Sequence, residues 1–267
     1  MIYFSSLLKT NPKYKPAADR LFAAFDSHGI PYGFLENTRD IWVRDFMPVR
    51  TKTGKYVSFR YDPGYLENDP DLKTDFRRDI SAQLPSPNII YSEINLDGGN
   101  IVFSPSRETA VISDRVFTEN WQCSSAELVQ ELERLLEARV IIIPSLSSDM
   151  TGHADGMMRF ANETTAIGNS TRYRSGLEIQ IKIALRNHGI EVIDFPYFSS
   201  PRDSAVGCYL NFLETDTHLI LPVFGAGTDI EAIAAAESLF KKIVVPVNIN
   251  EIAVDGGAMN CISWENN

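Results

Sequence analysis

Residues 124–144, SSAELVQELERLLEARVIIIP, decide the fold because they join an amphipathic helix directly to a buried strand. Ser124 and Glu127 have the spacing of a capping box at the start of a helix over 124–137. The helix carries one apolar stripe, made of Leu128, Val129, Leu132, Leu135 and Leu136. The β-branched run 140–143 follows and ends before Pro144, which predicts a buried strand.

The same order of helix and strand recurs along the chain. Near the C-terminus, Thr228 and Glu231 predict a capped helix before the strand IVVPV, which begins at Ile243. The apolar positions of that helix are Ile230, Ile233, Ala234 and Phe240. In SHGIPYGF and NHGIEVIDF, Gly29 and Gly189 are expected to end helices in the left-handed conformation before an extended segment.

A fifth and weaker helix is expected over 74–83, before a strand over 88–94. The preceding polar segment, 62–79, is rich in turn residues and is interpreted as a surface loop. Strand starts then fall near 30, 88, 140, 190 and 243, and 267 residues divided by five is about 53. The period predicts five copies of one unit in an α/β propeller, although a three-layer α/β sandwich also alternates helix and strand.

A polar motif follows each helix and strand pair. The key residues are Asp45 in WVRDFMP, Asp97 in NLDGGN, His153 and Asp155 in TGHADGMMRF, Asn211 in GCYLNF and Cys261 in VDGGAMNCIS. Counted on 45, 97, 153, 211 and 261, the motifs are 52, 56, 58 and 50 residues apart, which matches the structural repeat. In a closed ring, each motif should therefore reach an equivalent place near the axis.

Taken singly, each of these residues has a structural interpretation. Cys261 suits a buried structural cysteine, and Asp97 suits a turn residue that bonds its own backbone. His153 and Asp155, two residues apart, would face the same side if they lay on a strand. The joint periodicity favours a common site, in which cysteine and histidine indicate thiolate chemistry. Two aspartates there suit a guanidinium, since a carboxylate can accept two of its N–H groups.

Composition narrows the class of ligand. The chain has 25 Lys and Arg against 35 Asp and Glu, a net charge of −10, and no cluster of basic residues, which disfavours a nucleic-acid partner and suits a cationic one. No apolar run is long enough to span a membrane, and the N-terminal segment is interpreted as the first strand. Three cysteines are too few for a disulfide framework, so a cytoplasmic protein is expected.

The motifs TRDIWVRDFMPV, LDGGNIVF, GHADGMMRF, GCYLNF, LPVFGAGTD and GGAMNCIS span nearly the whole chain in this order. Together they resemble the guanidine-modifying, or pentein, superfamily, and within it the agmatine deiminase and bacterial-type peptidylarginine deiminase family. The resemblance implies a five-bladed α/β propeller of ββαβ units, formed as a single catalytic domain over residues 1–267.

The resemblance also implies roles for individual residues. Cys261 corresponds to the nucleophile and His153 to the general acid and base, while Asp45 and Asp155 correspond to the carboxylates that bind the guanidinium. Three further positions match as well: Asn211 lies in the active site, Trp42 lines the substrate channel, and Asp97 orients His153 where the agmatine enzymes usually carry glutamate. No metal or organic cofactor is implied.

The implied reaction is hydrolysis of a small cationic guanidino compound, most simply agmatine, to a ureido product and ammonia through a thiouronium on Cys261, as in putrescine biosynthesis. The chain departs from the agmatine enzymes at Met47, where they have glycine, and in GGAMNCIS, where they have GGGNIHCIT. Peptidylarginine or free arginine is the alternative substrate, and Arg60 and Arg159 are candidates to bind its carboxylate. An amidinotransferase, a non-catalytic binding protein of the same architecture and a metal hydrolase remain as further alternatives.

Overall fold

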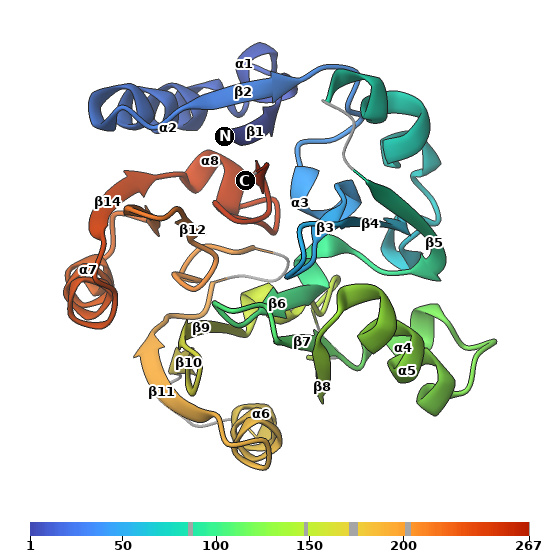
Figure 1. The fold of residues 1–267 in the computed structure, drawn as a ribbon. Helices are drawn as coiled ribbons and strands as arrows, with labels where there is room; N and C mark the ends of the chain where they lie inside the picture. The colour runs from blue at the N-terminus through green and yellow to red at the C-terminus, as the bar shows by residue number, and fades with distance from the viewer. Residues whose placement is uncertain (85–87, 147–148, 171–175, 201–203, 267) are drawn as a thin grey trace.

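Five three-stranded sheets surround a common centre in the computed structural model (Figure 1), which describes residues 1–84, 88–146, 149–170, 176–200 and 204–266. From inner to outer strand the sheets are β15 (Trp264–Glu265), β1 (Ile2–Ser5) and β2 (Tyr32–Leu35); β3 (Val49–Arg50), β4 (Tyr56–Arg60) and β5 (Ile89–Asn95); β6 (Ile101–Phe103), β7 (Thr109–Ser113) and β8 (Arg139–Ile143); β9 (Met158–Asn162), β10 (Thr165–Ser170) and β11 (Glu191–Pro196); β12 (Leu213–Glu214), β13 (His218–Val223) and β14 (Ile243–Asn248). The observed outer strands begin close to the predicted positions.

Each sheet repeats one pattern of pairing. The inner strand runs antiparallel to the middle strand, and the middle strand runs parallel to the outer one. Because parallel neighbours need a crossover, the helical segment of each unit lies between its middle and outer strands. The first sheet joins both ends of the chain, since β15 pairs with β1 through Tyr3 and Trp264. This arrangement confirms the propeller and excludes the three-layer sandwich.

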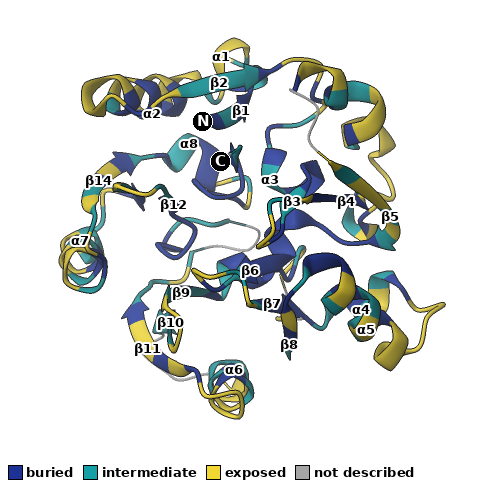
Figure 2. Cartoon of the chain, viewed as in Figure 1, coloured by how far each residue is buried: buried dark blue, intermediate teal, exposed yellow. Residues whose placement is uncertain are grey.

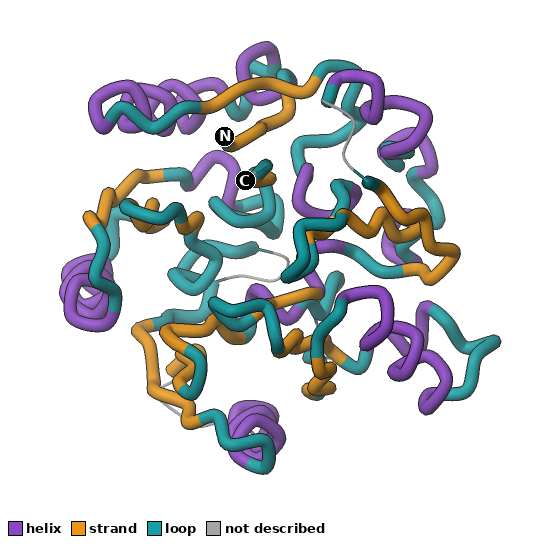
Figure 3. Tube along the Cα trace, viewed as in Figure 1, coloured by secondary structure: helices purple, strands orange, loops and turns teal. Residues whose placement is uncertain are grey.

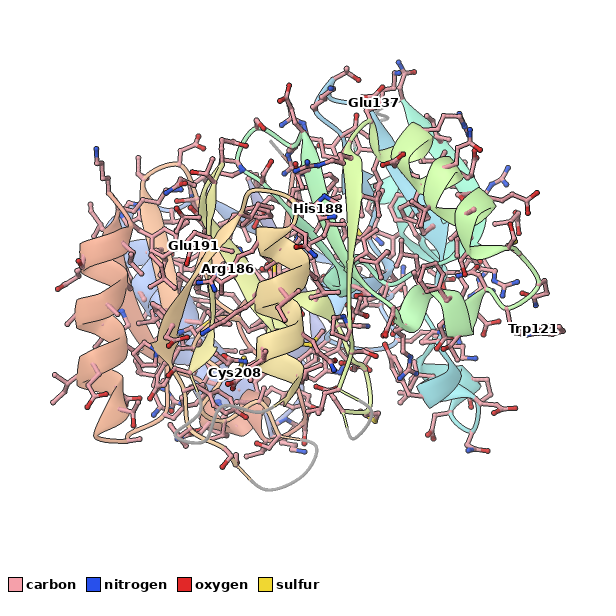
Figure 4. The ribbon with its side chains drawn as sticks, turned by 90° about the horizontal axis from the view of Figure 1, so that it is seen from below. Trp121, Glu137, Arg186, His188, Glu191 and Cys208 are labelled. Atoms are coloured by element: carbon pink, nitrogen blue, oxygen red, sulfur yellow. The ribbon has the colours of Figure 1, made fainter. Side chains whose placement is uncertain are left out.

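The helices form the outer layer of the ring (Figures 3 and 4). They are α1 (Leu7–Thr10), α2 (Lys15–His28), α4 (Arg115–Glu119), α5 (Ser125–Leu136), α6 (Gly176–Arg186) and α7 (Thr228–Leu239). The predicted Ser124 cap of α5 is confirmed, because its hydroxyl accepts a hydrogen bond from the Glu127 N–H; the Glu127 carboxylate accepts from this hydroxyl, and not from the Ser124 backbone N–H as in a full capping box. Gly29, with φ 63°, and Gly189, with φ 79°, have the expected left-handed backbone.

The helix α7 begins at Thr228, but its predicted cap is wrong and its predicted apolar stripe is only partly correct. Thr228 makes no capping hydrogen bond; the Asp229 carboxylate instead accepts from the N–H groups of the preceding loop, 224–226. Ile230 is 75% exposed, and the helix buries Ala232 and Ala236, whose small side chains permit close packing on the sheet. Of the predicted stripe, Phe240 is buried and Ile233 packs against the core, whereas Ile230 and Ala234 are exposed.

The weak helix predicted over 74–83 is also wrong as a regular α-helix. The chain forms a π-helical turn, Phe76–Ile80, and a 3₁₀ turn, Ser81–Gln83, preceded by 3₁₀ turns at Gly64–Leu66 and Pro70–Leu72. Carboxylates of this segment accept hydrogen bonds from its own backbone, as Asp75 does from the Arg78 N–H. Such hydrogen bonds compete with the backbone hydrogen bonds of a regular α-helix.

The centre of the ring is filled by the connections that lead from the outer strand of one unit to the inner strand of the next. They contain the short helices α3 (Val43–Phe46) and α8 (Asn250–Ala253) and the 3₁₀ turns Gly98–Asn100 and Ala154–Gly156. Figure 2 shows buried backbone at the centre, and the motif residues Asp45, Asp97, His153, Asn211 and Cys261 of these connections are all buried. Of the helices in the described part of the chain, none has the length and apolar character that a membrane span requires.

Candidate active site

The five polar motifs occupy these five connections. Asp45 lies in α3, Asp97 lies directly before the turn Gly98–Asn100, and His153 lies directly before the turn that contains Asp155. Asn211 and Cys261 precede the inner strands β12 and β15. Equivalent positions in the five repeats therefore converge on the centre, as the motif spacing predicts. The expectation that His153 and Asp155 share a strand is wrong, because a 3₁₀ turn carries them inward.

His153 lies between two carboxylates. Its Nε2 is 2.9 Å from Oδ2 of Asp97, and its Nδ1 is 3.6 Å from Oδ1 of Asp45. The Gly99 N–H donates to the same Asp45 oxygen at 3.1 Å, so a neighbouring connection holds this carboxylate in place. All three side chains are less than 10% exposed, and both ring nitrogens of His153 are therefore controlled by buried aspartates.

Gly99 marks the point that the site residues face. A β-carbon at this position would lie 2.5 Å from Oδ1 of Asp45, 2.8 Å from Nδ1 of His153 and 3.5 Å from Oδ2 of Asp155. Only a residue without a side chain leaves this space open. The second glycine of the LDGGN motif thus allows the aspartates and the histidine to approach one another.

Asp155 links this group to the cysteine. Its Oδ2 accepts hydrogen bonds from the side-chain amides of Asn211 at 3.0 Å and Asn260 at 2.7 Å, and it lies 3.6 Å from Sγ of Cys261. The side-chain oxygen of Asn211, Oδ1, accepts from the backbone N–H groups of Ala258, at 3.1 Å, and Cys261, at 3.3 Å. One asparagine therefore fixes both the carboxylate and the backbone of the cysteine segment.

Burial and charge shift the pKa values of the central groups. Burial by itself would lower the pKa of His153, but Asp45, Asp97 and Asp155 outweigh it and raise the pKa to about 9. Burial raises the pKa of Asp45 to about 7, partly opposed by His153. Burial, Asp155 and Asp45 hold the pKa of the Cys261 thiol well above its usual range. The empty site at neutral pH accordingly pairs a thiol with an imidazolium.

Trp42 forms a wall beside the cysteine segment. A β-carbon on Gly257 would lie 2.3 Å from the Trp42 ring, so the ring packs directly on that backbone. Asp40, two residues before Trp42, has its pKa raised to about 6 by burial and by the negative charge of Asp255. Asp40 also acts electrostatically on Tyr61, which lies close to Asp45 and Asp97 as well. Asp40 is therefore within electrostatic range of Asp255 and Tyr61.

The two arginine candidates have other partners. Arg60 is exposed and pairs with Asp62 at 3.8 Å. Arg159 donates to the Phe212 carbonyl at 3.2 Å, and its guanidinium lies 4.5 Å from the centre of the Phe212 ring. The structure thus gives each arginine a local structural contact, whereas it brings the other sequence-predicted residues together or, for Trp42, against the cysteine segment.

Sequence reasoning missed three residues of the site. Asn260 stands directly before Cys261, and its contact with Asp155 follows from its neighbour. Tyr61 and Tyr65 belong to or adjoin the segment interpreted as a surface loop, yet the Tyr65 hydroxyl donates to Asp97 at 2.9 Å. Their aromatic character within a polar segment was the available signal. Among the described residues, no group of three or more His, Cys, Asp and Glu side chains could hold a metal ion.

The comparisons with known proteins agree with this geometry. The family model for Porphyromonas-type peptidyl-arginine deiminase matches residues 11–266. An agmatine deiminase of C. jejuni superimposes with a TM-score of 0.78 at 16% identity, covering 98% of this chain and 92% of the other. An agmatine deiminase of Enterococcus faecalis gives 0.77 at 15% identity, with coverages of 98% and 92%.

A more distant structure extends the likeness. DDAH from Pseudomonas aeruginosa gives a TM-score of 0.61 at 12% identity, covering 98% of this chain and 97% of the other. At these identities the structural matches establish a common fold, the five-bladed α/β propeller expected from the motifs. Comparison with curated protein sequences gives no significant match.

Proposed function

Because the chain belongs to the Porphyromonas-type peptidyl-arginine deiminase family, we propose that it is a guanidine deiminase acting on agmatine or a related small guanidino compound. The observation that carries this proposal is the arrangement around Gly99 and Asp155. Two aspartates and a histidine face one point, and the Cys261 sulfur lies 3.6 Å from one of those aspartates. We place the chemistry in one catalytic domain over residues 1–267.

The proposed reaction uses Cys261 as the nucleophile. The buried thiol loses its proton to solvent when the cationic guanidinium enters, because the positive charge favours the thiolate. The thiolate attacks the central carbon, and the His153 imidazolium donates its proton to the departing nitrogen, which leaves as ammonia. Neutral His153 then takes a proton from water, which displaces the sulfur from the thiouronium and gives the ureido product.

The aspartates act by position and charge. Asp45 and Asp155 present oxygens toward the space beside Gly99, where they can accept the N–H groups of a planar cation. The amides of Asn211 and Asn260 both bond Oδ2 of Asp155, the oxygen that faces Gly99, and so fix its position. Fixed carboxylates need no reorganisation as the reaction proceeds, so they stabilise the charged intermediates at low cost.

Agmatine is favoured over substrates that carry a carboxylate. Arg60 and Arg159, which could have bound a carboxylate, are engaged by Asp62 and Phe212. Asp40 instead provides negative charge on the side of Trp42, which suits the ammonium at the far end of agmatine. An agmatine deiminase variant of C. jejuni is among the matching structures with substrate bound. With agmatine, the step would lie in putrescine synthesis in the cytoplasm.

The test is turnover of agmatine, free arginine and a peptidylarginine, each followed by ammonia release and by mass spectrometry of the ureido product. We expect turnover of agmatine, at a higher kcat/KM than the other two. Cys261→Ala should lose it, while Cys123→Ala, at an exposed cysteine, should retain it. Absence of ammonia and ureido product from all three compounds would refute the proposal, and a product that requires an added amine would indicate amidino transfer instead.

A further inference from the structure

We propose that Tyr65 is a positioning residue that shares one oxygen of Asp97 with His153 and thereby limits how strongly Asp97 holds the imidazolium. The catalytic meaning of this inference rests on the proposed function, whereas the contacts of Tyr65 are independent of it. The Tyr65 hydroxyl donates to Asp97 Oδ2 at 2.9 Å, and His153 Nε2 lies 2.9 Å from the same atom. The phenol and imidazole rings also meet edge to face, with centroids 6.3 Å apart.

The turn that carries Tyr65 is anchored from a neighbouring unit. Glu119, at the end of α4, accepts from the Gly64 N–H with both carboxylate oxygens at 3.3 Å. Arg115 pairs with Glu119 at 3.1 Å, and its guanidinium lies 5.9 Å from the centre of the Tyr65 ring. These contacts join two residues of α4 to the turn Gly64–Leu66. The contacts with Glu119 and Arg115 hold the Tyr65 ring next to Asp97 and His153.

The hydroxyl of Tyr65 is a permanent neutral donor. Burial and the charge of Asp97 hold its pKa well above the usual range, and burial with the charges of Asp45 and Asp97 does the same for Tyr61. The groups that act on His153 are therefore the carboxylates Asp45, Asp97 and Asp155, with the two neutral phenols behind Asp97.

A hydrogen bond from a phenol draws negative charge toward itself, so it weakens the attraction of Asp97 for a protonated imidazole. Without this hydrogen bond, His153 should keep its proton to higher pH. A general acid that must also become a base works best when its pKa is near the working pH. Tyr65 thus opposes the three aspartates, which together raise the pKa of His153.

The test measures the pKa of His153 in the intact protein by NMR, without turnover. The chain has four histidines, so isotope labelling gives few signals, and His153→Asn identifies the one of interest. Tyr65→Phe should raise the His153 pKa by about half to one unit, the size expected when part of one charge-assisted hydrogen bond is lost. Tyr61→Phe should give a smaller rise, because Tyr65, and not Tyr61, donates the hydrogen bond to Asp97.

Tyr32→Phe is the matched control, since it removes a tyrosine to aspartate hydrogen bond of 3.1 Å between the outer strand β2 and Asp26 in the outer helix α2. It should leave the His153 pKa unchanged. An unchanged pKa in folded Tyr65→Phe, or an equal shift in Tyr32→Phe, would overturn the inference. Because the measurement needs no substrate, a chain that turns over no guanidino compound would refute the proposed function alone.

Discussion

Replacing Gly99 with alanine should block the site without unfolding the protein. The new β-carbon would lie 2.5 Å from Oδ1 of Asp45, which is 0.9 Å short of the 3.4 Å at which ordinary contact begins. It would lie 2.8 Å from Nδ1 of His153, which is 0.6 Å short. Both side chains must move by most of these distances, and a shift of about 1 Å in a reacting group costs about 100-fold in rate.

The variant is assayed by ammonia release and by thermal unfolding. We expect kcat/KM with agmatine to fall at least about 100-fold, because both the acid and a binding carboxylate move. Crowding of this size costs about 1–3 kcal/mol of folding free energy, so the melting temperature should fall by about 2–12 °C.

Gly156→Ala is the matched control for Gly99→Ala. Gly156 also lies in a 3₁₀ turn of a site motif, but a β-carbon there meets nothing within 4 Å. It should keep activity within about threefold of the wild type. If folded Gly99→Ala is as active as the control, the geometry assigned to the centre of the site is wrong.

Three further predictions follow from the same contacts. Gly257→Ala should raise KM about tenfold, because the new β-carbon displaces the Trp42 ring. In a Trp42→Ala background the same substitution should have little effect on KM. An equal rise in KM in both backgrounds would contradict the clash. The pKa of Asp45 is raised from 3.8 to about 7 on folding, so the free energy of unfolding should fall as pH rises from about 4 to 7. Asp45→Asn should therefore raise the melting temperature at neutral pH, while it lowers kcat/KM at least about 100-fold. If unfolding of the variant depends on pH as it does in the wild type, the charge of Asp45 is not buried. Without substrate, alkylation of Cys261 by iodoacetamide should be slow at pH 7, and its rate should rise steeply above pH 9. The exposed Cys123 serves as the internal reference in the same digest. Faster labelling of Cys261 than of Cys123 at pH 7 would mean that the thiolate already exists without substrate.

The convergence of the site was predictable because the fold repeats. Asp45, Asp97, His153, Asn211 and Cys261 recur at the interval of the helix and strand units, so a ring necessarily brings them to equivalent positions. Local signals worked where one face of an element is clearly apolar, as in α5 with its capping serine. They failed in part of α7, where Ala232 and Ala236 pack inward while Ile230 is exposed, because tertiary contact overrides the pattern.

Contacts between repeats were beyond sequence reasoning. Tyr65 lies in a polar, turn-rich segment, and its approach to Asp97 depends on Arg115 and Glu119, which are fifty or more residues away in the sequence. The role of Gly99 likewise follows from three side chains contributed by other connections. Gly99 acts by leaving space, and Tyr65 acts by a hydrogen bond to Asp97, the partner of His153. Neither role produces a periodic pattern in the sequence.

The central claim is that Cys261 attacks a guanidinium held by Asp45 and Asp155. A haloacetamidine carries the same planar cation beside an electrophilic carbon, so it should bind at these carboxylates and alkylate the adjacent sulfur. After incubation and digestion, mass spectrometry should find the label at Cys261, and agmatine should protect that residue. Labelling at Cys123 or Cys208, or labelling of Cys261 that agmatine does not reduce, would contradict the account.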